Sequence, residues 1–284
     1  MKYEIYSGAG NDFVMINNWN GEIPFDKQNK FTIDICNNQF KDIDGVIFID
    51  RPLKAGSAIR MNYYNRDGSF GAMCGNGARC IAMFAYKNGI IREKSFTLEA
   101  VEDKYEAEII DDLNVKITSP EPKEIKLDLF IKADFENGPK EMNVSYVNIG
   151  SDHLVIFLNE TINKTALGNK TIDEIDISFI GKILRFHNDF QPQGVNVNFV
   201  IPVSQNEIRV RTYERGVERE TLACGTGIIS SAVISVLKNK SKHPIRVLVQ
   251  SGEWLTVDLK IEDLMIKNLS LQGSARKISE GELD

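Results

Sequence analysis

The chain has 284 residues, a hydrophobic content of 42% and a net charge of −6, so it is globular and long enough for one large core or two medium-sized domains. This acidic balance leaves no basic stripe, and no apolar run approaches membrane-spanning length, so we expect neither a nucleic-acid partner nor a membrane. The chain opens on strand-like residues without an apolar signal core, and its four cysteines are typical of reduced thiols. We therefore expect a cytoplasmic protein.

The first half of the chain is predicted to consist mostly of short strands. A short helix is expected at 33–38, and a longer apolar helix at 78–87, which Asn88 and Gly89 end as a left-handed cap would. Asp67-Gly68 marks a turn before that helix, because this pair tolerates positive φ. The strands expected in this half are at residues 2–6, 13–16, 46–49, 59–64, 95–100, 105–110 and 115–118.

The segment 119–124 breaks this pattern with two prolines and flanking charges, so we expect a linker there. Beyond it the same order of elements returns. Helices are expected at 172–186, where the pattern is amphipathic, and at 228–237. The strands expected in this half are at residues 144–149, 154–158, 195–200, 208–213, 246–249, 254–259 and 264–266.

Both halves thus run through strands, a polar turn, a Cys-Gly-x-Gly segment, a helix and further strands. This predicts an α+β protein of two pseudo-symmetric domains, each a curved, mostly antiparallel sheet or barrel wrapped around a central helix. The N-terminal domain is expected to span 1–118, with a C-terminal strand near 268–284 packed on it, and the C-terminal domain 119–267. We expect the active site where the N-termini of the two helices face one another.

Two cysteines, Cys74 and Cys224, stand 150 positions apart in matching motifs, MCGNG and ACGTG. A lone cysteine is usually a small buried hydrophobe, but here the context is repeated. A thiol in the first turn of a helix feels the positive end of the backbone dipole, which favours thiolate. The adjacent glycine lets backbone N–H groups approach an anion such as a carboxylate. Two such groups suit a reaction that removes a proton from one face of a carbon and returns it to the other.

The remaining candidate residues carry weaker signals. Cys36 and Cys80 are expected to be buried, because a C-x5-C spacing without a histidine pair matches no usual zinc site, so we expect no metal. His153 lies in a turn, where a lone histidine is more often structural than catalytic. Glu214 and Arg215 precede the second cysteine and suit an ammonium group and a carboxylate, respectively.

Three segments together resemble the diaminopimelate epimerase family: GAGNDFVMI at 8–16, YNRDGSFGAMCGNGARC at 64–80 and YERGVERETLACGTG at 213–227. The resemblance implies a two-domain isomerase, often a homodimer, that uses neither pyridoxal phosphate nor a metal and has no cofactor. Its small-molecule substrate would be diaminopimelate, with the LL and meso isomers interconverted by a thiolate/thiol pair. The reaction belongs to the synthesis of lysine and peptidoglycan precursors.

The same resemblance assigns roles to individual residues. Cys74 and Cys224 would be the catalytic acid/base pair, while His153 and Glu214 would tune the pKa values of the two thiols. The residues that would bind the substrate are Asn11, Asn65, Gly75, Asn76, Ser151, Asn196, Glu214, Arg215, Gly225 and Thr226.

The chain departs from the common family pattern in one turn near these residues. Gly-Asn-Pro-His is frequent in the family where this chain has Gly150-Ser151-Asp152-His153. Ser151 would donate a single hydrogen bond to a distal carboxylate, whereas the asparagine of the common pattern has an amide group with two N–H donors. Asp152 places a carboxylate beside His153 and is expected to raise the pKa of the imidazole.

Three other functions remain open at this stage. A two-cysteine racemase of proline or hydroxyproline is disfavoured by Asn76, where such enzymes would have histidine, and by the Glu214-Arg215 pair, which is excessive for a small ring. A related isomerase that uses a carboxylate instead of thiols is disfavoured because both thiols are present. A redox-sensing or metal-binding cysteine protein is disfavoured by the glycines after each thiol and by the lack of ligand-spaced histidines.

Overall fold

The structure is a computed structural model that describes residues 1–71, 73–263 and 265–283. Ala72, Leu264 and Asp284 lie outside the described residues. The first residue of the strand expected at 264–266 is therefore among those that are not described. The chain divides into two compact units. Unit 1 comprises Met1–Thr118 and Leu271–Asp284, and unit 2 comprises Ser119–Ser270. Each unit is described by itself.

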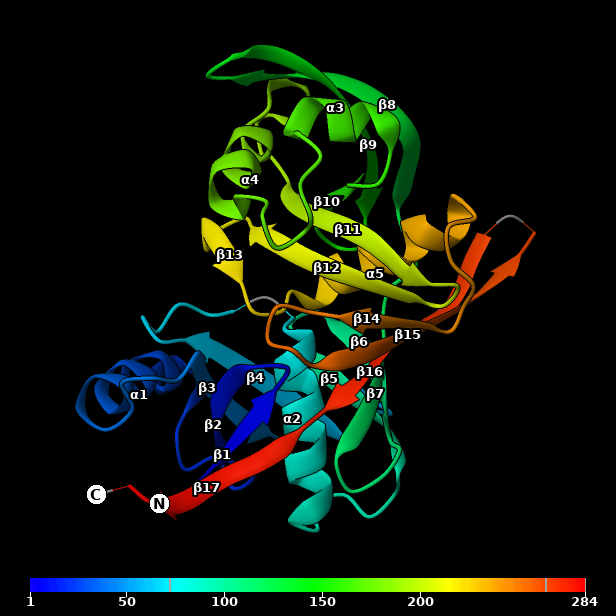
Figure 1. Ribbon diagram of the computed structural model, residues 1–284. Coiled ribbons are helices and arrows are strands. Elements are labelled where there is room, and N and C mark those ends of the chain that lie inside the picture. Colours follow the sequence, from blue (N-terminus) through cyan, green and yellow to red (C-terminus); the bar gives the residue numbers. More distant parts are fainter. Residues whose placement is uncertain (72, 264, 284) are drawn as a thin grey trace. The chain divides into compact units, whose positions relative to one another are not determined.

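Unit 1 contains two helices and most of the N-terminal strands (Figure 1). Its elements are β1 (Lys2–Gly8), β2 (Asn11–Asn17), α1 (Phe25–Asn38), β3 (Gly45–Asp50), β4 (Ile59–Asn65), α2 (Gly75–Lys87), β5 (Ser95–Ala100), β6 (Asp103–Ile109), β7 (Asn114–Thr118) and β17 (Arg276–Glu282). β1 pairs antiparallel with β2 and β17, as do β3 with β4, β5 with β6 and β6 with β7. The pairs β2–β3 and β4–β5 are parallel.

Unit 2 contains the remaining helices and strands (Figure 1). Its elements are β8 (Glu124–Phe135), β9 (Gly138–Asn148), β10 (Asp152–Phe157), α3 (Thr161–Leu167), α4 (Ile177–Arg185), the 3₁₀ helix η1 (Asn188–Phe190), β11 (Asn196–Ser204), β12 (Glu207–Glu214), β13 (Arg219–Thr221), α5 (Gly225–Leu237), β14 (Ile245–Leu248) and β15 (Trp254–Glu262). β16 (Met265–Ser274) begins in unit 2 and ends in unit 1.

The order of strand pairing in unit 2 repeats that of unit 1. β9–β10 is antiparallel, β10–β11 parallel, β11–β12 antiparallel, β12–β14 parallel and β14–β15 antiparallel, which matches the series from β1 to β6. A parallel pair needs a crossover connection, and each unit places a helix in each crossover: α1 and α2 in unit 1, α4 and α5 in unit 2. The predicted α+β class is confirmed.

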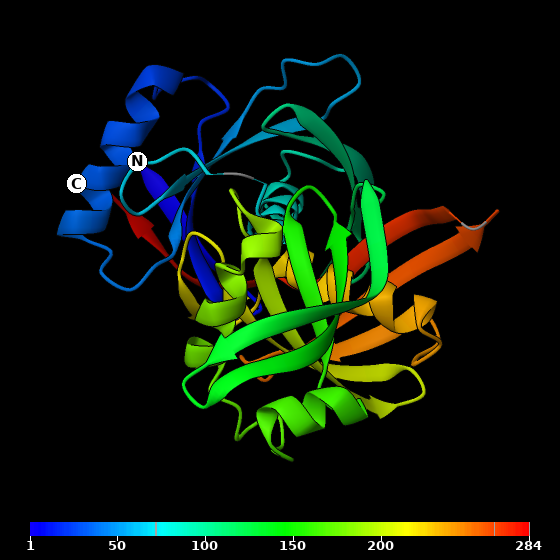
Figure 2. The same ribbon diagram turned by 90° about the horizontal axis from the view of Figure 1, so that it is seen from above.

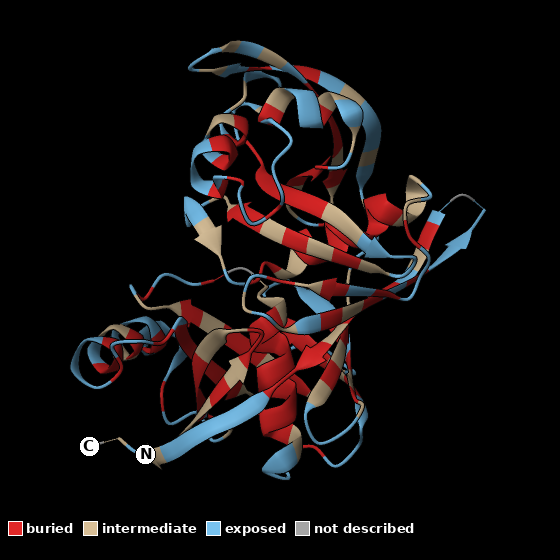
Figure 3. Cartoon of the chain, viewed as in Figure 1, coloured by how far each residue is buried: buried red, intermediate tan, exposed pale blue. Residues whose placement is uncertain are grey.

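One helix lies at the centre of each unit. α2 contacts β1, β2, β3, β4, β6 and β7, and α5 contacts β9, β10, β11, β12, β14 and β15. Figure 2 views α2 nearly end-on with the strands of its own unit around it, and Figure 3 shows it buried along most of its length. Every residue of α2 from Asn76 to Ala85 is buried, including the polar Asn76 and Arg79, as expected of a helix that strands surround.

All four predicted helices differ from the structure in their starting residues. α2 begins at Gly75, not at 78, and α5 at Gly225, not at 228, so each begins directly after its cysteine. α1 begins at Phe25, not at 33, because its buried face includes the polar residues Gln28 and Thr32, which hide the apolar period. α4 begins at Ile177, not at 172, because the Asp176 carboxylate caps it by accepting a 2.9 Å hydrogen bond from the Phe179 N–H. The sequence reading also missed α3 and β8. Within the described ranges, no helix is both long and apolar enough to cross a membrane.

Candidate active site

Both cysteines of the repeated motif are N-cap residues. Cys74 precedes α2 with φ −104° and ψ 109°, and Cys224 precedes α5 with φ −111° and ψ 111°. Each helix is 13 residues long, so the two thiols occupy the same structural position in the two repeats. The first backbone N–H groups of a helix have no partner within it and carry the positive end of its dipole. Each thiol therefore lies beside donors that suit an anion.

The two thiols differ in their immediate partners. The Cys74 Sγ accepts a 3.4 Å hydrogen bond from the Gly77 N–H and is half-buried. The Cys224 Sγ lies 3.6 Å from the Thr226 Oγ1 and is buried. The Cys74 sulfur thus has a backbone N–H as its donor, whereas the Cys224 sulfur contacts a side-chain hydroxyl.

The glycines of each Cys-Gly-x-Gly segment serve different purposes. Of the described residues, only Leu271, with its Cδ2 at 4.0 Å, would meet a Cβ on Gly75, so this position is not closely packed. A Cβ on Gly77 would lie 2.7 Å from Ile47 Cδ1, and one on Gly227 would lie 2.3 Å from Asn198 Oδ1. The second glycine of each segment is therefore required by packing against the surrounding strands, a role that the sequence did not reveal.

Two predicted substrate residues of unit 1 are joined in a chain of hydrogen bonds. The fully buried Arg79 can only donate, and its Nη2 lies 2.8 Å from Asn76 Oδ1, which fixes the orientation of that amide. Asn76 Nδ2 then donates to Asn11 Oδ1 at 2.7 Å. Since Oδ1 of Asn11 accepts in this bond, its amide nitrogen has no hydrogen-bond acceptor among residues 1–71, 73–263 and 265–283 and can donate to another group. Asn65 is the last residue of β4, and its Nδ2 donates to Ser69 Oγ in the following turn at 2.9 Å.

In unit 2, a buried network fixes the tautomer of His153. Asn198 Nδ2 donates to the Leu154 carbonyl at 2.8 Å, and Asn198 Oδ1 accepts from the Thr212 hydroxyl at 2.9 Å, so the orientation of this amide is determined. The same Nδ2 lies 3.1 Å from His153 Nδ1. Nδ1 must therefore accept, and the single proton of the neutral ring is on Nε2.

Nε2 of His153 directs that proton at the hydroxyl groups next to Cys224. Nε2 lies 2.9 Å from Ser151 Oγ and 2.9 Å from Thr226 Oγ1, the hydroxyl adjacent to the Cys224 thiol. Three predicted site residues (Ser151, His153 and Thr226) are thus brought into one cluster. Asn198 completes it and was missed, although two asparagines alternating on one face of the apolar run 195–200 were a usable signal.

Asp152 does act to raise the pKa of His153, as expected, but two other effects outweigh it. Burial, followed by the nearby Arg215 cation, lowers the pKa of His153 to about 3, and the opposing effect of Asp152 is smaller. The Asp152 carboxylate is 3.0 Å from Arg215 Nη1, so its charge is largely directed at the guanidinium. His153 therefore stays neutral as a hydrogen-bond donor.

We expect His153 to make folding stability depend on pH. Below its ordinary pKa the imidazole is protonated in the unfolded chain but neutral in the folded one, so stability falls as the pH decreases from about 6.5 towards 3. The contribution is at most about 1.4 kcal/mol per pH unit. Urea unfolding of the wild type and of His153→Gln at pH 7 and pH 5.5 measures it. Equal losses of stability in the two proteins would contradict the assignment.

A second cluster in unit 2 surrounds Arg215. Its backbone N–H donates to Asn196 Oδ1 at 2.9 Å, and Asn196 Nδ2 donates to the Asp152 carbonyl at 2.9 Å. Glu214 Oε2 accepts a 2.8 Å hydrogen bond from the Thr221 hydroxyl. The predicted residues Asn196 and Arg215 thus lie together. Among the described residues, no group of three or more His, Cys, Asp or Glu side chains is arranged to hold a metal ion.

Comparison with known proteins supports the motif-based resemblance. The chain matches the diaminopimelate epimerase family over residues 3–123 and 145–278. It is 37% identical to the diaminopimelate epimerase of Aquifex aeolicus (strain VF5), with 100% of this chain and 98% of that protein covered.

Two solved structures share the fold. A phenazine biosynthesis protein of the PhzF family from Bacillus anthracis has a TM-score of 0.71 at 12% identity and covers 100% of this chain and 98% of its own. A hydroxyproline epimerase from Agrobacterium vitis, with bound trans-4-OH-L-proline, has a TM-score of 0.69 at 16% identity, covering 99% and 91%. Since these identities are low, they speak for the fold alone. The near-complete family match and the relative at 37% identity show that the chain belongs to the diaminopimelate epimerase family and is an isomerase.

Proposed function

We propose that this family member interconverts LL- and meso-2,6-diaminopimelate without a cofactor, using Cys74 and Cys224 as its acid/base pair. The observation that carries the proposal is the equivalent placement of the two thiols, each at the N-cap of the central helix of one repeat. A reaction that inverts one carbon needs a base for one face and an acid for the other, and a repeated helix start supplies two groups of the same kind.

In the proposed reaction, the thiolate of one cysteine takes the α-proton, so an S–H bond forms as the C–H bond breaks. The electron pair of that bond delocalises into the α-carboxylate, where the N–H groups of Gly75, Asn76, Gly225 and Thr226 suit the growing charge. The thiol of the other cysteine then protonates the opposite face of the carbon. Proton transfer by one positioned group contributes about 10²–10⁴-fold, so most of the acceleration comes from these donors and from excluding water.

The other predicted residues fit supporting roles in this reaction. We assign Arg215 to the distal carboxylate of the substrate and Glu214 to an ammonium group, with Asn11, Asn65 and Asn196 as further substrate ligands. His153 acts through the Thr226 hydroxyl on Cys224: because Nε2–H donates to Oγ1, the hydroxyl proton is available to the sulfur. Ser151 belongs to the same cluster and shares that donor.

The biological setting is part of the proposal. Diaminopimelate epimerisation belongs to the synthesis of lysine and of peptidoglycan precursors, which we place in the cytoplasm, with the enzyme acting as a homodimer. The support for this setting is the family membership. We also propose that the two repeats, 1–118 with the C-terminal strand and 119–267, each contribute one of the thiols.

The test is α-proton exchange of LL-diaminopimelate in D₂O, followed by NMR with freshly reduced protein and no added cofactor. We expect deuterium at one α-carbon together with the appearance of the meso isomer, because inversion passes through a solvent-exchangeable thiol. Denatured protein is the control. Exchange with proline or hydroxyproline, but none with diaminopimelate, would overturn the proposal in favour of a proline-type racemase.

A further inference from the structure

Asp152 is held in place by three side-chain donors in unit 2. Its Oδ1 accepts hydrogen bonds from the Tyr146 hydroxyl at 2.5 Å and from Asn148 Nδ2 at 2.8 Å, and its Oδ2 lies 3.0 Å from Arg215 Nη1. These donors lower the pKa of Asp152 although burial opposes them, so the carboxylate is ionised at neutral pH. Asp152 forms an ion pair with the Arg215 guanidinium, and the side chains of Asp152 and Arg215 are 23% and 25% exposed, respectively.

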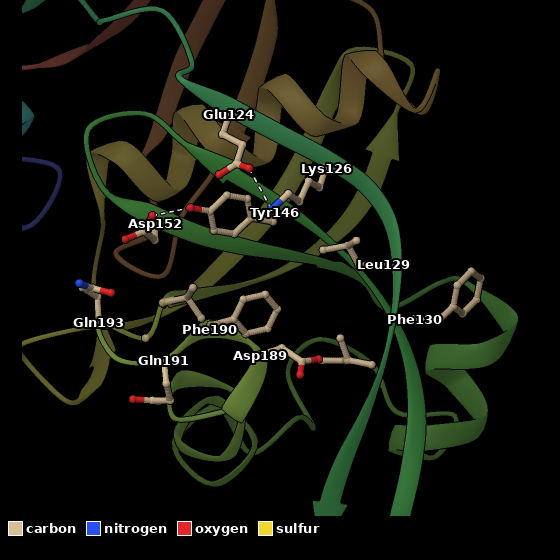
Figure 4. A pocket seen from close by; sticks show the side chains of 13 residues that line it. Glu124, Lys126, Leu129, Phe130, Tyr146, Asp152, Asp189, Phe190, Gln191 and Gln193 are labelled. Atoms are coloured by element: carbon tan, nitrogen blue, oxygen red, sulfur yellow. Dashed lines mark hydrogen bonds and ion pairs between the residues drawn. The ribbon is translucent and has the colours of Figure 1, made fainter.

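Tyr146 is itself fixed by packing. Its ring stacks on that of Phe190, with centroids 6.3 Å apart and an interplanar angle of 1°. Figure 4 shows the Tyr146 hydroxyl pointing at Asp152, on the wall of a pocket of about 390 Å³ that Phe190 and Gln193 also line. The hydrogen bonds from Tyr146 and Asn148 therefore fix the position of the Asp152 carboxylate whether or not Arg215 binds a ligand.

The two side-chain hydrogen bonds of Arg215 both come from one nitrogen of its guanidinium group. Nη1 carries two hydrogens, and it donates to Asp152 Oδ2 at 3.0 Å and to the Gly194 carbonyl at 2.9 Å. Among the described residues, Nε and Nη2 of Arg215 have no hydrogen-bond partner. These two nitrogens form the edge of the guanidinium that binds a carboxylate through two parallel hydrogen bonds.

We propose that Asp152 is a positioning residue that orients Arg215, so that the Nε–Nη2 edge of the guanidinium is presented to the distal carboxylate of the substrate. The inference rests on the proposed function, since it assumes that Arg215 binds that carboxylate. A long arginine side chain would otherwise lose rotamer freedom on binding, and anchoring Nη1 in advance removes much of that cost. Asp152 thus contributes to substrate affinity, not to the proton transfers.

The test compares Asp152→Asn with wild type in steady-state kinetics on LL-diaminopimelate. The amide cannot accept from Tyr146, Asn148 and Arg215 at once without turning its NH₂ group towards a donor, so the anchor is lost. We expect KM to rise about tenfold or more, with kcat changed by less than about twofold. The matched control is Asp173→Asn, which removes the exposed carboxylate that pairs with Arg209 in the same unit and should leave both constants unchanged.

A double-mutant comparison separates positioning from a general loss of structure. If Asp152 acts through Arg215, Asp152→Asn should add nothing to the raised KM of Arg215→Ala. An equal further rise in that background would overturn the inference, as would an Asp152→Asn enzyme with unchanged or lower KM. Should Asp152→Asn fail to fold, Tyr146→Phe removes one anchor of the carboxylate and should raise KM in the same selective way, and an unchanged KM there also overturns it.

The outcomes distinguish the two proposals. A wild-type enzyme that does not act on diaminopimelate overturns the proposed function and this inference together. An active wild type whose Asp152→Asn variant keeps its KM overturns the inference alone.

Discussion

Replacing either Cys74 or Cys224 by alanine is expected to abolish epimerisation of diaminopimelate while leaving the fold intact. Each thiol serves as the acid in one direction and the base in the other, so losing one removes a proton transfer that contributes about 10²–10⁴-fold and cannot be supplied by its neighbours. Alanine removes one sulfur atom from an N-cap position without a steric clash. Circular dichroism and thermal unfolding should therefore remain close to wild type, whereas formation of the meso isomer should fall below detection.

The two variants should also differ from one another in a way that reports their stereochemistry. The remaining thiolate can still remove the α-proton from the isomer whose C–H bond faces it. After its S–H group exchanges with D₂O, it can return a deuteron to the same face of the carbon. We therefore expect one variant to exchange only LL-diaminopimelate in D₂O, the other only the meso isomer at its D-centre, and neither to invert the carbon. Cys36→Ala, which changes a buried cysteine of α1, is the control and should retain activity. Full epimerase activity in either variant would refute the two-base assignment.

Gly227→Ala is expected to destabilise the protein strongly and to remove activity with it. The added Cβ would lie 2.3 Å from Asn198 Oδ1 and 3.2 Å from Thr212 Oγ1, both buried and hydrogen-bonded to each other. Relieving the clash must either shift the start of α5 or turn the amide that fixes the His153 tautomer. We expect a loss of about 3 kcal/mol in the free energy of unfolding, from overpacking combined with disrupted buried hydrogen bonds. Urea denaturation measures it.

The control for that variant is Gly75→Ala in the other helix start. Within the described part of the chain, a Cβ there would meet only Leu271 Cδ2 at 4.0 Å, so the stability of Gly75→Ala should stay near that of wild type. Because Gly75 is proposed to approach the substrate, its activity should still fall. If Gly75→Ala and Gly227→Ala lowered the free energy of unfolding equally, the closer packing around Gly227 would not explain the effect.

The positions of the two thiols could be read from the sequence because the signals are local. An N-cap, a following glycine and an apolar run lie within a few residues of each other, and their preferences do not depend on distant parts of the chain. The same local pattern occurring twice also predicted a repeated fold. Where a local signal was weak, as at the polar buried face of α1 or in the exposed strand β8, the prediction was wrong or missing.

The sequence by itself thus determined the family, the α+β class and the location of Cys74 and Cys224 at two helix starts. Only the tertiary structure decided the hydrogen-bond partners that give the surrounding residues their properties. Asn11 with Asn76, Asp152 with Arg215, and His153 with Thr226 are 65, 63 and 73 residues apart in the chain. Such contacts arise from the pairing of strands and the packing of a helix against them, so neither the depressed pKa of His153 nor the anchoring of Arg215 is encoded in any short stretch of sequence.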